Sequence, residues 1–202
     1  PPAPQPPPEP PAERALTRVL KRPDGQTMTV ELPARLSDGH RVSTHGVTLQ
    51  AVLEGHEGTP SPQGEDVVYA DGAVRYRFNE AGGLEDWVVS TTNQPLRYRL
   101  VQRGGGGYHA SNGRVVVVDH EGYPRLQVTA PTAIDANGKR LTGRVSLTDC
   151  AHDRGTAPPW WRPPTPADAC TLVVTWDHAK ATAPVTVDPL WEPVLNGLPE
   201  GR

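Results

Sequence analysis

Hydrophobic and polar residues alternate with a period of two through most of this chain of 202 residues. The clearest cases are VRYRF at 74–78 and LRYRL at 96–100, in which arginines separate aromatic and aliphatic residues. Because successive side chains of a β-strand point to opposite faces of a sheet, this alternation predicts half-buried antiparallel strands. We therefore expect Tyr76 and Tyr98 to lie in a core and Arg99 to face water.

The same period recurs in further short segments, which are separated by residues typical of tight turns. The segments are MTVEL, VTLQAVL, DWVVST, GRVVVVD, RLQVTA, GRVSL, TLVVTW and APVTV, and the turns are ADG, EAGG, SNG, HEG and DANG. Asp, Asn and Gly tolerate the positive φ angles that hairpins need, and we interpret RGGGGYH at 103–109 as one more, flexible turn. About ten short strands with such turns predict an all-β, antiparallel β-sandwich-like domain.

The composition divides the chain into four parts. Residues 1–14 have eight prolines in their first eleven positions, which predicts an extended or disordered spacer, with a ligand for a proline-binding module as the alternative. Residues 15–60 are a short N-terminal β subdomain or the first strands, although a helix at 12–21 is an alternative for their beginning. The main β-sandwich-like module spans 66–191, and residues 192–202 are a C-terminal linker.

The charge and hydropathy of the chain exclude two classes of partner. The formal net charge is -3, and lysine and arginine are scattered without a basic run, so no nucleic acid is expected. The longest uninterrupted run of valine is Val115–Val118, far short of the roughly 18 apolar residues that span a bilayer. We therefore expect no membrane span.

Both cysteines of the chain, Cys150 and Cys170, flank a proline-rich loop. A zinc site could recruit them with His152 and His178, but the close ligand pairs typical of zinc sites are absent. Neighbouring aspartates would raise the pKa of a thiol, which disfavours a nucleophilic cysteine. One predicted strand ends at the first cysteine and another begins at the second, so pairing of these strands predicts a disulfide. A disulfide in turn predicts an oxidising location: extracellular, cell-surface or periplasmic.

The loop between the cysteines carries Trp160, Trp161 and Arg162, with prolines on both sides. Prolines restrict their own φ angles and the residues before them, so this loop is predicted to be stiff. A stiff aromatic tip suits a sugar ring or a protein partner, since little entropy is lost on contact. The alternative is that the tryptophans cover an open end of the sandwich. We expect one ring to pack inward and the other to stay partly exposed.

No catalytic motif stands out in the sequence. The chain has no GxSxG, no HExxH and no paired-carboxylate motif. Asp119, His120 and Glu121 resemble acid–base equipment, but they fall in a turn and are interpreted as a solvated hairpin tip. We therefore expect no catalytic residues, no metal and no cofactor, and a hydrolase with an unrecognised site is the alternative.

From about Asp66 to Trp191, the order of strands and turns resembles the β-rich N-terminal module of large secreted bacterial repeat proteins of the propeller or RHS type. In those proteins, a P-x-A-x-D-x-x-G strand and turn precedes a closing PVxxDP. The matching residues here are Pro131, Ala133, Asp135, Gly138, Pro184, Val185, Asp188 and Pro189. The resemblance implies an extracellular all-β module without catalytic residues, and the cysteine-bounded loop looks like an insertion in it.

The function that we expect from the sequence is that of a structural or interaction module in a larger secreted or surface assembly. Its partners would be neighbouring domains or another protein. The alternative is a carbohydrate- or protein-binding module that uses Trp160 and Trp161.

Overall fold

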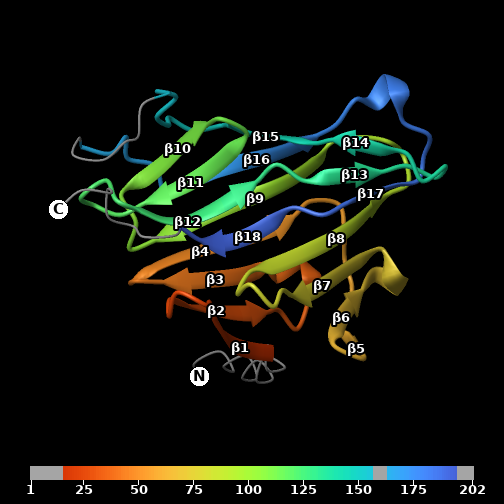
Figure 1. The fold of residues 1–202 in the computed structure, drawn as a ribbon, viewed down its shortest axis with the longest axis horizontal. Coiled ribbons are helices and arrows are strands. Elements are labelled where there is room, and N and C mark those ends of the chain that lie inside the picture. Colours follow the sequence, from red (N-terminus) through yellow and green to blue (C-terminus); the bar gives the residue numbers. More distant parts are fainter. Residues whose placement is uncertain (1–15, 157–162, 195–202) are drawn as a thin grey trace, which may run out of the picture.

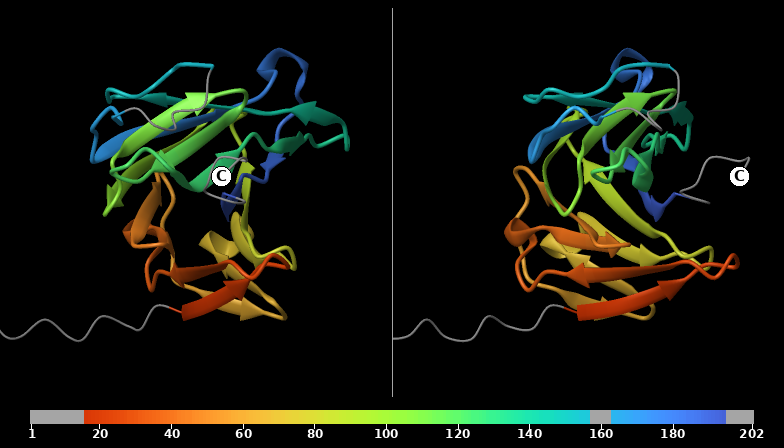
Figure 2. Two further views of the ribbon diagram at one scale, coloured as in Figure 1. Left: turned by 60° about the vertical axis from the view of Figure 1, so that its left-hand side comes forward. Right: turned by 90° about the vertical axis from the view of Figure 1, so that its left-hand side faces the viewer.

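The computed structural model describes residues 16–156 and 163–194, which form two antiparallel β-sheets packed on each other (Figure 1, Figure 2). The predicted all-β, sandwich-like fold is confirmed. Within the described ranges there is no α-helix, and the only helical turns are three 3₁₀ segments: Leu36–Asp38, Ala70–Gly72 and His178–Lys180. The predicted spacer at 1–14 lies outside the described residues, as do residues 195–202 of the predicted linker.

Sheet A has seven strands drawn from three separate parts of the chain. In spatial order they are β1 (Leu16–Lys21), β2 (Thr27–Leu32), β3 (His40–Thr44), β4 (Val47–Leu53), β9 (Leu96–Arg103), β16 (Ala169–Thr175) and β15 (Arg144–Thr148). The segment at 16–21 is therefore a strand, so the helix alternative is wrong. The pairing of β1 with β2 explains this, because six residue pairs join the two strands, whereas an isolated helix of this length is only marginally stable in water.

Sheet B has eleven strands and is built around β8 (Leu84–Ser90). On one edge, β8 pairs with β7 (Val74–Phe78), which continues the sheet to β6 (Asp66–Tyr69) and β5 (Ser61–Gln63). On its other edge, β8 pairs with β17 (Val185–Val187) and then with β18 (Leu190–Pro193). The remaining strands extend the sheet beyond these two: β10 (Gly107–Ser111), β11 (Arg114–Val118), β12 (Pro124–Thr129), β13 (Thr132–Ile134) and β14 (Arg140–Thr142).

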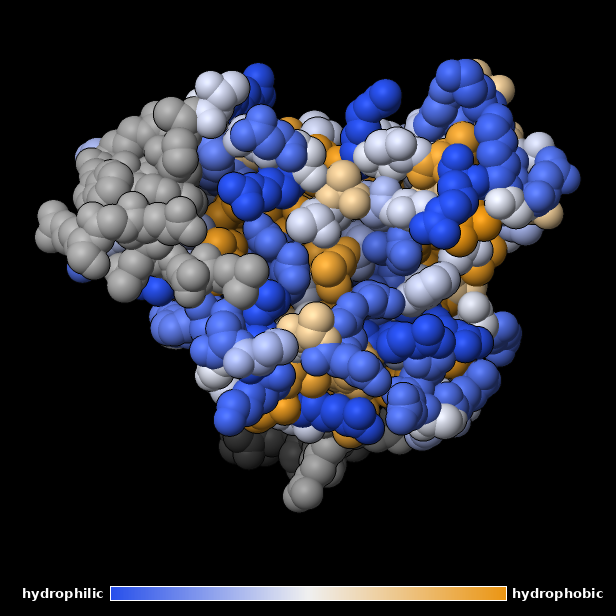
Figure 3. Space-filling view, viewed as in Figure 1, coloured by the Kyte–Doolittle hydropathy of each residue, from blue (hydrophilic) through white to orange (hydrophobic). Residues whose placement is uncertain are grey.

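The predicted alternation in β7 and β9 is confirmed by the burial of their side chains. Tyr76 and Tyr98 are buried, whereas Arg99 is exposed. The two strands belong to different sheets, so these tyrosines reach the core from opposite sides. Figure 3 views the sheet B side, where hydrophilic residues predominate and hydrophobic ones show between them in small areas. The inward half of each alternating strand thus builds one shared core between the sheets.

Three hairpin turns share one design, which begins with Asn79, Asp119 or Asp135. In each turn, the side-chain Oδ1 of the first residue accepts the backbone N–H two residues later, at 2.7, 2.9 and 2.9 Å. The fourth residue is a glycine with φ of 87°, 86° and 76°, a conformation that other residues rarely adopt. The predicted turns EAGG, HEG and DANG are therefore confirmed, and Asp119–Glu121 forms a hairpin tip.

The run Gly104–Gly107 carries the chain from β9 in sheet A to β10 in sheet B. A Cβ atom on Gly104, Gly106 or Gly107 would overlap a backbone carbonyl oxygen of Gly46, Asp119 or Thr165, respectively. The run is thus a close-packed crossing between three loops, and its interpretation as a flexible turn is corrected. Glycine is required here because neighbouring backbones leave no room for a side chain.

Candidate functional site

A disulfide joins Cys150 and Cys170, as the sequence predicts. Their Cα atoms are 5.1 Å apart, within the usual range for a disulfide. The bond closes the open end of the β15–β16 hairpin, in which Thr148 is opposite Thr171. Because both thiols are used in this bond, neither cysteine can bind zinc as the metal alternative requires. No cluster of three metal-ligating groups exists among residues 16–156 and 163–194.

Both described ends of the disulfide-bounded loop are held against the sandwich. On the first side, His109 Nε2 lies 2.7 Å from the carbonyl oxygen of Gly155. On the second side, the Gln102 side chain donates to the carbonyl oxygen of Ala167 at 3.0 Å, and its backbone N–H donates to Asp168 at 2.8 Å. The loop therefore leaves and rejoins the fold from fixed positions. The candidate binding residues Trp160, Trp161 and Arg162 lie outside the described residues.

Removing the disulfide should lower the stability of the protein while its two sheets remain folded. We expect Cys150→Ser with Cys170→Ser to lower the free energy of unfolding by about 3 kcal/mol, because the bond restricts the unfolded chain. Urea denaturation of the oxidised protein and of the double variant measures this difference. An unchanged midpoint would show that the closed loop contributes nothing to stability.

Five polar side chains meet in the centre of the sandwich, and we call them the central polar cluster: His40 of β3, Tyr76 of β7, Asp86 of β8, Tyr98 of β9 and Trp191 of β18. The Tyr98 hydroxyl donates to Asp86 Oδ2 at 2.9 Å, and the Tyr76 hydroxyl is hydrogen-bonded to His40 Nδ1 at 3.2 Å. The Trp191 ring contacts His40 and Tyr98 edge-on, with centroids 4.7 and 5.5 Å apart. Both hydrogen bonds cross from one sheet to the other.

Burial shifts the ionisation of this cluster in two opposite senses. It lowers the pKa of the His40 imidazole from 6.5 to about 3, because the charged ring would be removed from water. It raises the pKa of the Asp86 carboxyl from 3.8 to about 7, an effect that the Tyr98 hydroxyl and Trp191 N–H oppose and Asp188 reinforces. The indole N–H of Trp191 favours the charged form of Asp86, although its geometry falls short of a hydrogen bond. Both groups are therefore held mainly uncharged between about pH 3 and pH 7.

The central polar cluster contains acid–base groups, but each of its side chains is at most 1% exposed. A substrate needs access to the reacting atoms, so the observed arrangement gives this cluster a structural role. Sequence reasoning identified its tyrosines and missed Asp86 and His40. The signal was present, because Asp86 alternates in register with the apolar residues Leu84 and Val88.

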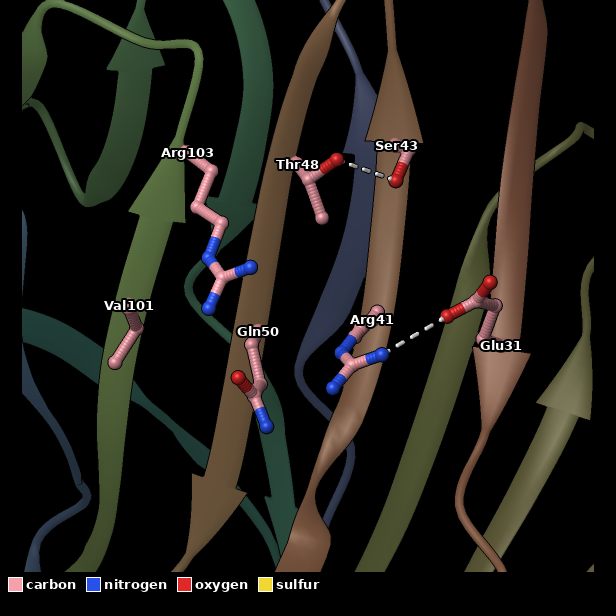
Figure 4. A pocket seen from close by; sticks show the side chains of 7 residues that line it. All are labelled: Glu31, Arg41, Ser43, Thr48, Gln50, Val101 and Arg103. Atoms are coloured by element: carbon pink, nitrogen blue, oxygen red, sulfur yellow. Dashed lines mark hydrogen bonds and ion pairs between the residues drawn. The ribbon is translucent and has the colours of Figure 1, made fainter. Parts of the chain in front are cut away.

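One accessible candidate site is a groove on the outer face of sheet A, with a volume of about 240 Å³. Its walls come from four adjacent strands, β2, β3, β4 and β9, as Figure 4 shows. Charged and polar side chains line it almost entirely: Glu31, Arg41, Ser43, Thr48, Gln50 and Arg103, with Val101 beside them. We call this the sheet A groove. The sequence analysis did not find it, because outward-facing polar residues on a strand are typical of any solvated sheet.

The guanidinium groups of the two sheets differ in their partners. On sheet B, Arg75 and Arg77 both bind Asp66 at 3.0 Å, and the hydrogen bond from Arg77 is the main cause that lowers the pKa of this carboxyl. On the outer face of sheet A, Arg99 and Arg103 form no ion pair with any residue in the described part of the chain. This face therefore offers cationic hydrogen-bond donors that no carboxylate in the described part of the chain occupies.

The remaining histidines of the rejected zinc alternative have local roles. His152 accepts a hydrogen bond from Arg154 at 3.2 Å, and His178 Nδ1 lies 2.6 Å from the carbonyl oxygen of Asn93.

No helix in the described ranges is long and apolar enough to cross a membrane.

The comparisons with known proteins add no family and no function to the structural observations. The resemblance to secreted repeat proteins remains a prediction, because it depends on the pattern of strand and turn residues. No protein-family model, no curated protein and no solved structure matches the chain.

Proposed function

We propose that the chain is a non-catalytic interaction module of a larger secreted or surface assembly, and that the outer face of sheet A is its contact surface. The observation that carries this proposal is the lack of carboxylate partners for Arg99 and Arg103 among the described residues. Arginine is enriched at interfaces, where its planar group makes several directed hydrogen bonds. An exposed face with such donors is suited to a partner of complementary charge.

The charge of this face opposes the charge of the whole chain. Its outward arginines include Arg41, which pairs with Glu31, and Arg97, which pairs with Glu54 and Asp149. They also include Arg99 and Arg103, which form no ion pair with a described residue. The complete chain nevertheless carries a formal charge of -3 at pH 7. Positive charge is thus concentrated where it can steer an anionic partner toward sheet A.

The proposed setting outside the cytoplasm has two supports. The Cys150–Cys170 disulfide is typical of oxidising compartments. The strand and turn pattern resembles modules of secreted repeat proteins, whose neighbours would be further domains of the same assembly. A non-catalytic role agrees with the full burial of His40 and Asp86, the groups best suited to acid–base chemistry, because a substrate could not reach them.

A second candidate function is binding through the loop that carries Trp160 and Trp161. The observation that favours it is the fixed base of this loop, where the disulfide and the hydrogen bonds of His109 and Gln102 hold both ends. A fixed base reduces the entropy that the loop would lose on binding.

Cation-exchange chromatography tests the contact surface without knowledge of the partner. At pH 7, we expect the protein to be retained on a sulfonate matrix despite its net charge of -3. Arg99→Gln with Arg103→Gln should elute at clearly lower salt. The control Arg35→Gln with Arg140→Gln changes the net charge equally, uses exposed arginines outside the strands of sheet A, and should elute close to the unmodified protein.

Three results of this experiment would separate the alternatives. Equal shifts for both arginine pairs would show that charge is not concentrated on sheet A, which contradicts the proposal. No retention of the unmodified protein would contradict it as well. A shift caused by Arg162→Gln, and not by the sheet A pair, would favour the loop as the contact surface.

A further inference from the structure

The sheet A groove has the size and composition of a site for a small polar ligand. Its volume of about 240 Å³ is below the roughly 300–1,000 Å³ of pockets for drug-sized molecules, which leaves room for one sugar ring. Figure 4 shows the side chains of Arg103 and Arg41 on the two sides of Gln50. The groove therefore presents two guanidinium groups around one amide.

Arg103 supplies the cationic donor of this site. It is exposed and has no ion pair among the described residues, so its planar guanidinium is free to bind a carboxylate through two parallel hydrogen bonds. Arg41 is paired with Glu31 at 3.5 Å, and both side chains are about half exposed, which makes this ion pair weak. A ligand carboxylate can therefore compete for Arg41 as well.

The polar groups between the arginines are already oriented. Gln50 Nε2 donates to the carbonyl oxygen of Asp38 at 2.6 Å, which fixes the amide and leaves its Oε1 as an acceptor. Ser43 Oγ and Thr48 Oγ1 are hydrogen-bonded to each other at 2.9 Å, so one of these two hydroxyls keeps its proton for a ligand. Fixed acceptors and donors at this spacing suit the hydroxyl groups of a sugar, and Val101 offers a small apolar surface to its C–H groups.

We propose that the sheet A groove binds the acidic ring of a carboxylate-bearing saccharide, such as a uronic acid. Arg103 holds the carboxylate, and Gln50 with the Ser43–Thr48 pair binds the ring hydroxyls. Glu31 lies at the opposite wall and repels ligands with densely spaced negative charges, which disfavours sulfated chains and nucleic acids. This inference rests on the proposed function, because it assigns a ligand class to the same face.

Calorimetric titration with an oligogalacturonide tests the assignment. The matched neutral probe is the galactose oligosaccharide of equal length, and a heparin fragment is the sulfated probe. We expect the oligogalacturonide to bind at least about tenfold more tightly than the neutral probe, because a charge-assisted bidentate hydrogen bond is lost in the latter. The sulfated fragment should bind more weakly than the oligogalacturonide.

The variants separate a built site from diffuse attraction. Arg103→Gln and Gln50→Ala should each weaken the binding of the oligogalacturonide by about tenfold or more. Arg140→Gln is the charge-matched control, because it removes the same charge from an exposed residue of β14 in sheet B, outside the groove, and it should change affinity by less than about twofold. Circular dichroism of each variant checks that the fold is intact.

Two outcomes would overturn this inference. Equal losses for Arg140→Gln and Arg103→Gln, with tighter binding of heparin, would show only diffuse electrostatic attraction. No binding of any saccharide, together with retention on the sulfonate matrix that depends on Arg99 and Arg103, would reject the saccharide and leave the contact surface in place. Loss of that retention as well would reject both proposals.

Discussion

Replacing Tyr98 with alanine is expected to lower the free energy of unfolding by about 4 kcal/mol, as large aromatic truncations in a core do. The ring is fully buried and packs edge-on against Trp191, so its removal leaves a cavity between the sheets. The substitution also removes the hydroxyl that donates to Asp86 at 2.9 Å. A buried acceptor without its donor adds a penalty of its own.

Two further variants of β9 divide this loss into its parts. Tyr98→Phe keeps the ring and removes only the hydrogen bond, so we expect about 1–3 kcal/mol. Arg99→Ala changes the neighbouring residue on the opposite face and should alter stability by less than about 0.5 kcal/mol. Urea denaturation of the three variants measures these values. Similar losses for Tyr98→Ala and Arg99→Ala would show that the inward and outward faces of β9 are assigned wrongly.

The second large effect concerns how stability depends on pH. The folded-state pKa of His40 is about 3 against 6.5 for an ordinary histidine, so below pH 6.5 the unfolded chain binds a proton that the folded chain does not. Stability therefore rises with pH in this range through His40. The folded-state pKa of Asp86 is about 7 against 3.8, so the folded chain holds a proton that the unfolded chain loses. Stability falls as pH rises through Asp86.

These two contributions cancel between about pH 4 and 6.5 in the unmodified protein, because each amounts to about 1.4 kcal/mol per pH unit with opposite sign. Asp86→Asn leaves only the contribution of His40. We expect this variant to gain about 2 kcal/mol of stability between roughly pH 4.5 and pH 6. His40→Gln leaves only Asp86 and should lose a similar amount over the same interval.

Urea denaturation at these pH values, with the double variant His40→Gln and Asp86→Asn as control, checks the sign of each slope. The neighbouring Tyr76 and Tyr98 hydroxyls do not titrate in this interval, because burial raises their pKa well above its usual value. Parallel slopes for the two single variants would contradict the opposite shifts. An NMR titration of the unmodified protein adds a direct check, since the His40 ring should stay neutral at about pH 5.

Much of the fold follows from local sequence patterns. The alternation in β7 and β9 predicts which side chains are buried, because a strand has only two faces. The disulfide was predictable for the same local reason, since the ends of two adjacent strands, β15 and β16, bring Cys150 and Cys170 together. Turns that begin with Asp119 and Asp135 depend on the chemistry of five consecutive residues and were recognisable as well.

The candidate sites could not be predicted in this way, because they depend on which strands become neighbours. The central polar cluster unites His40 with Trp191, which are far apart in the sequence and meet only after both sheets have formed. The sheet A groove needs β4 beside β9, a pairing across more than 40 residues that includes Ala51 opposite Leu100. Alternation assigns a face to each residue but does not name its neighbour on the next strand.

Because β8 pairs with strands that come much later in the chain, sheet B stays incomplete during much of protein synthesis. Sheet B cannot close until β17 and β18 pair with β8, and β17 begins at Val185, roughly 95 residues after β8 ends at Ser90. At a synthesis rate of about 5–20 residues per second, the open edge of β8 waits about 5–20 s for its partners. Pairing across such a separation is also slow in itself. The nascent chain is therefore most prone to wrong strand pairing before residues 185–193 emerge.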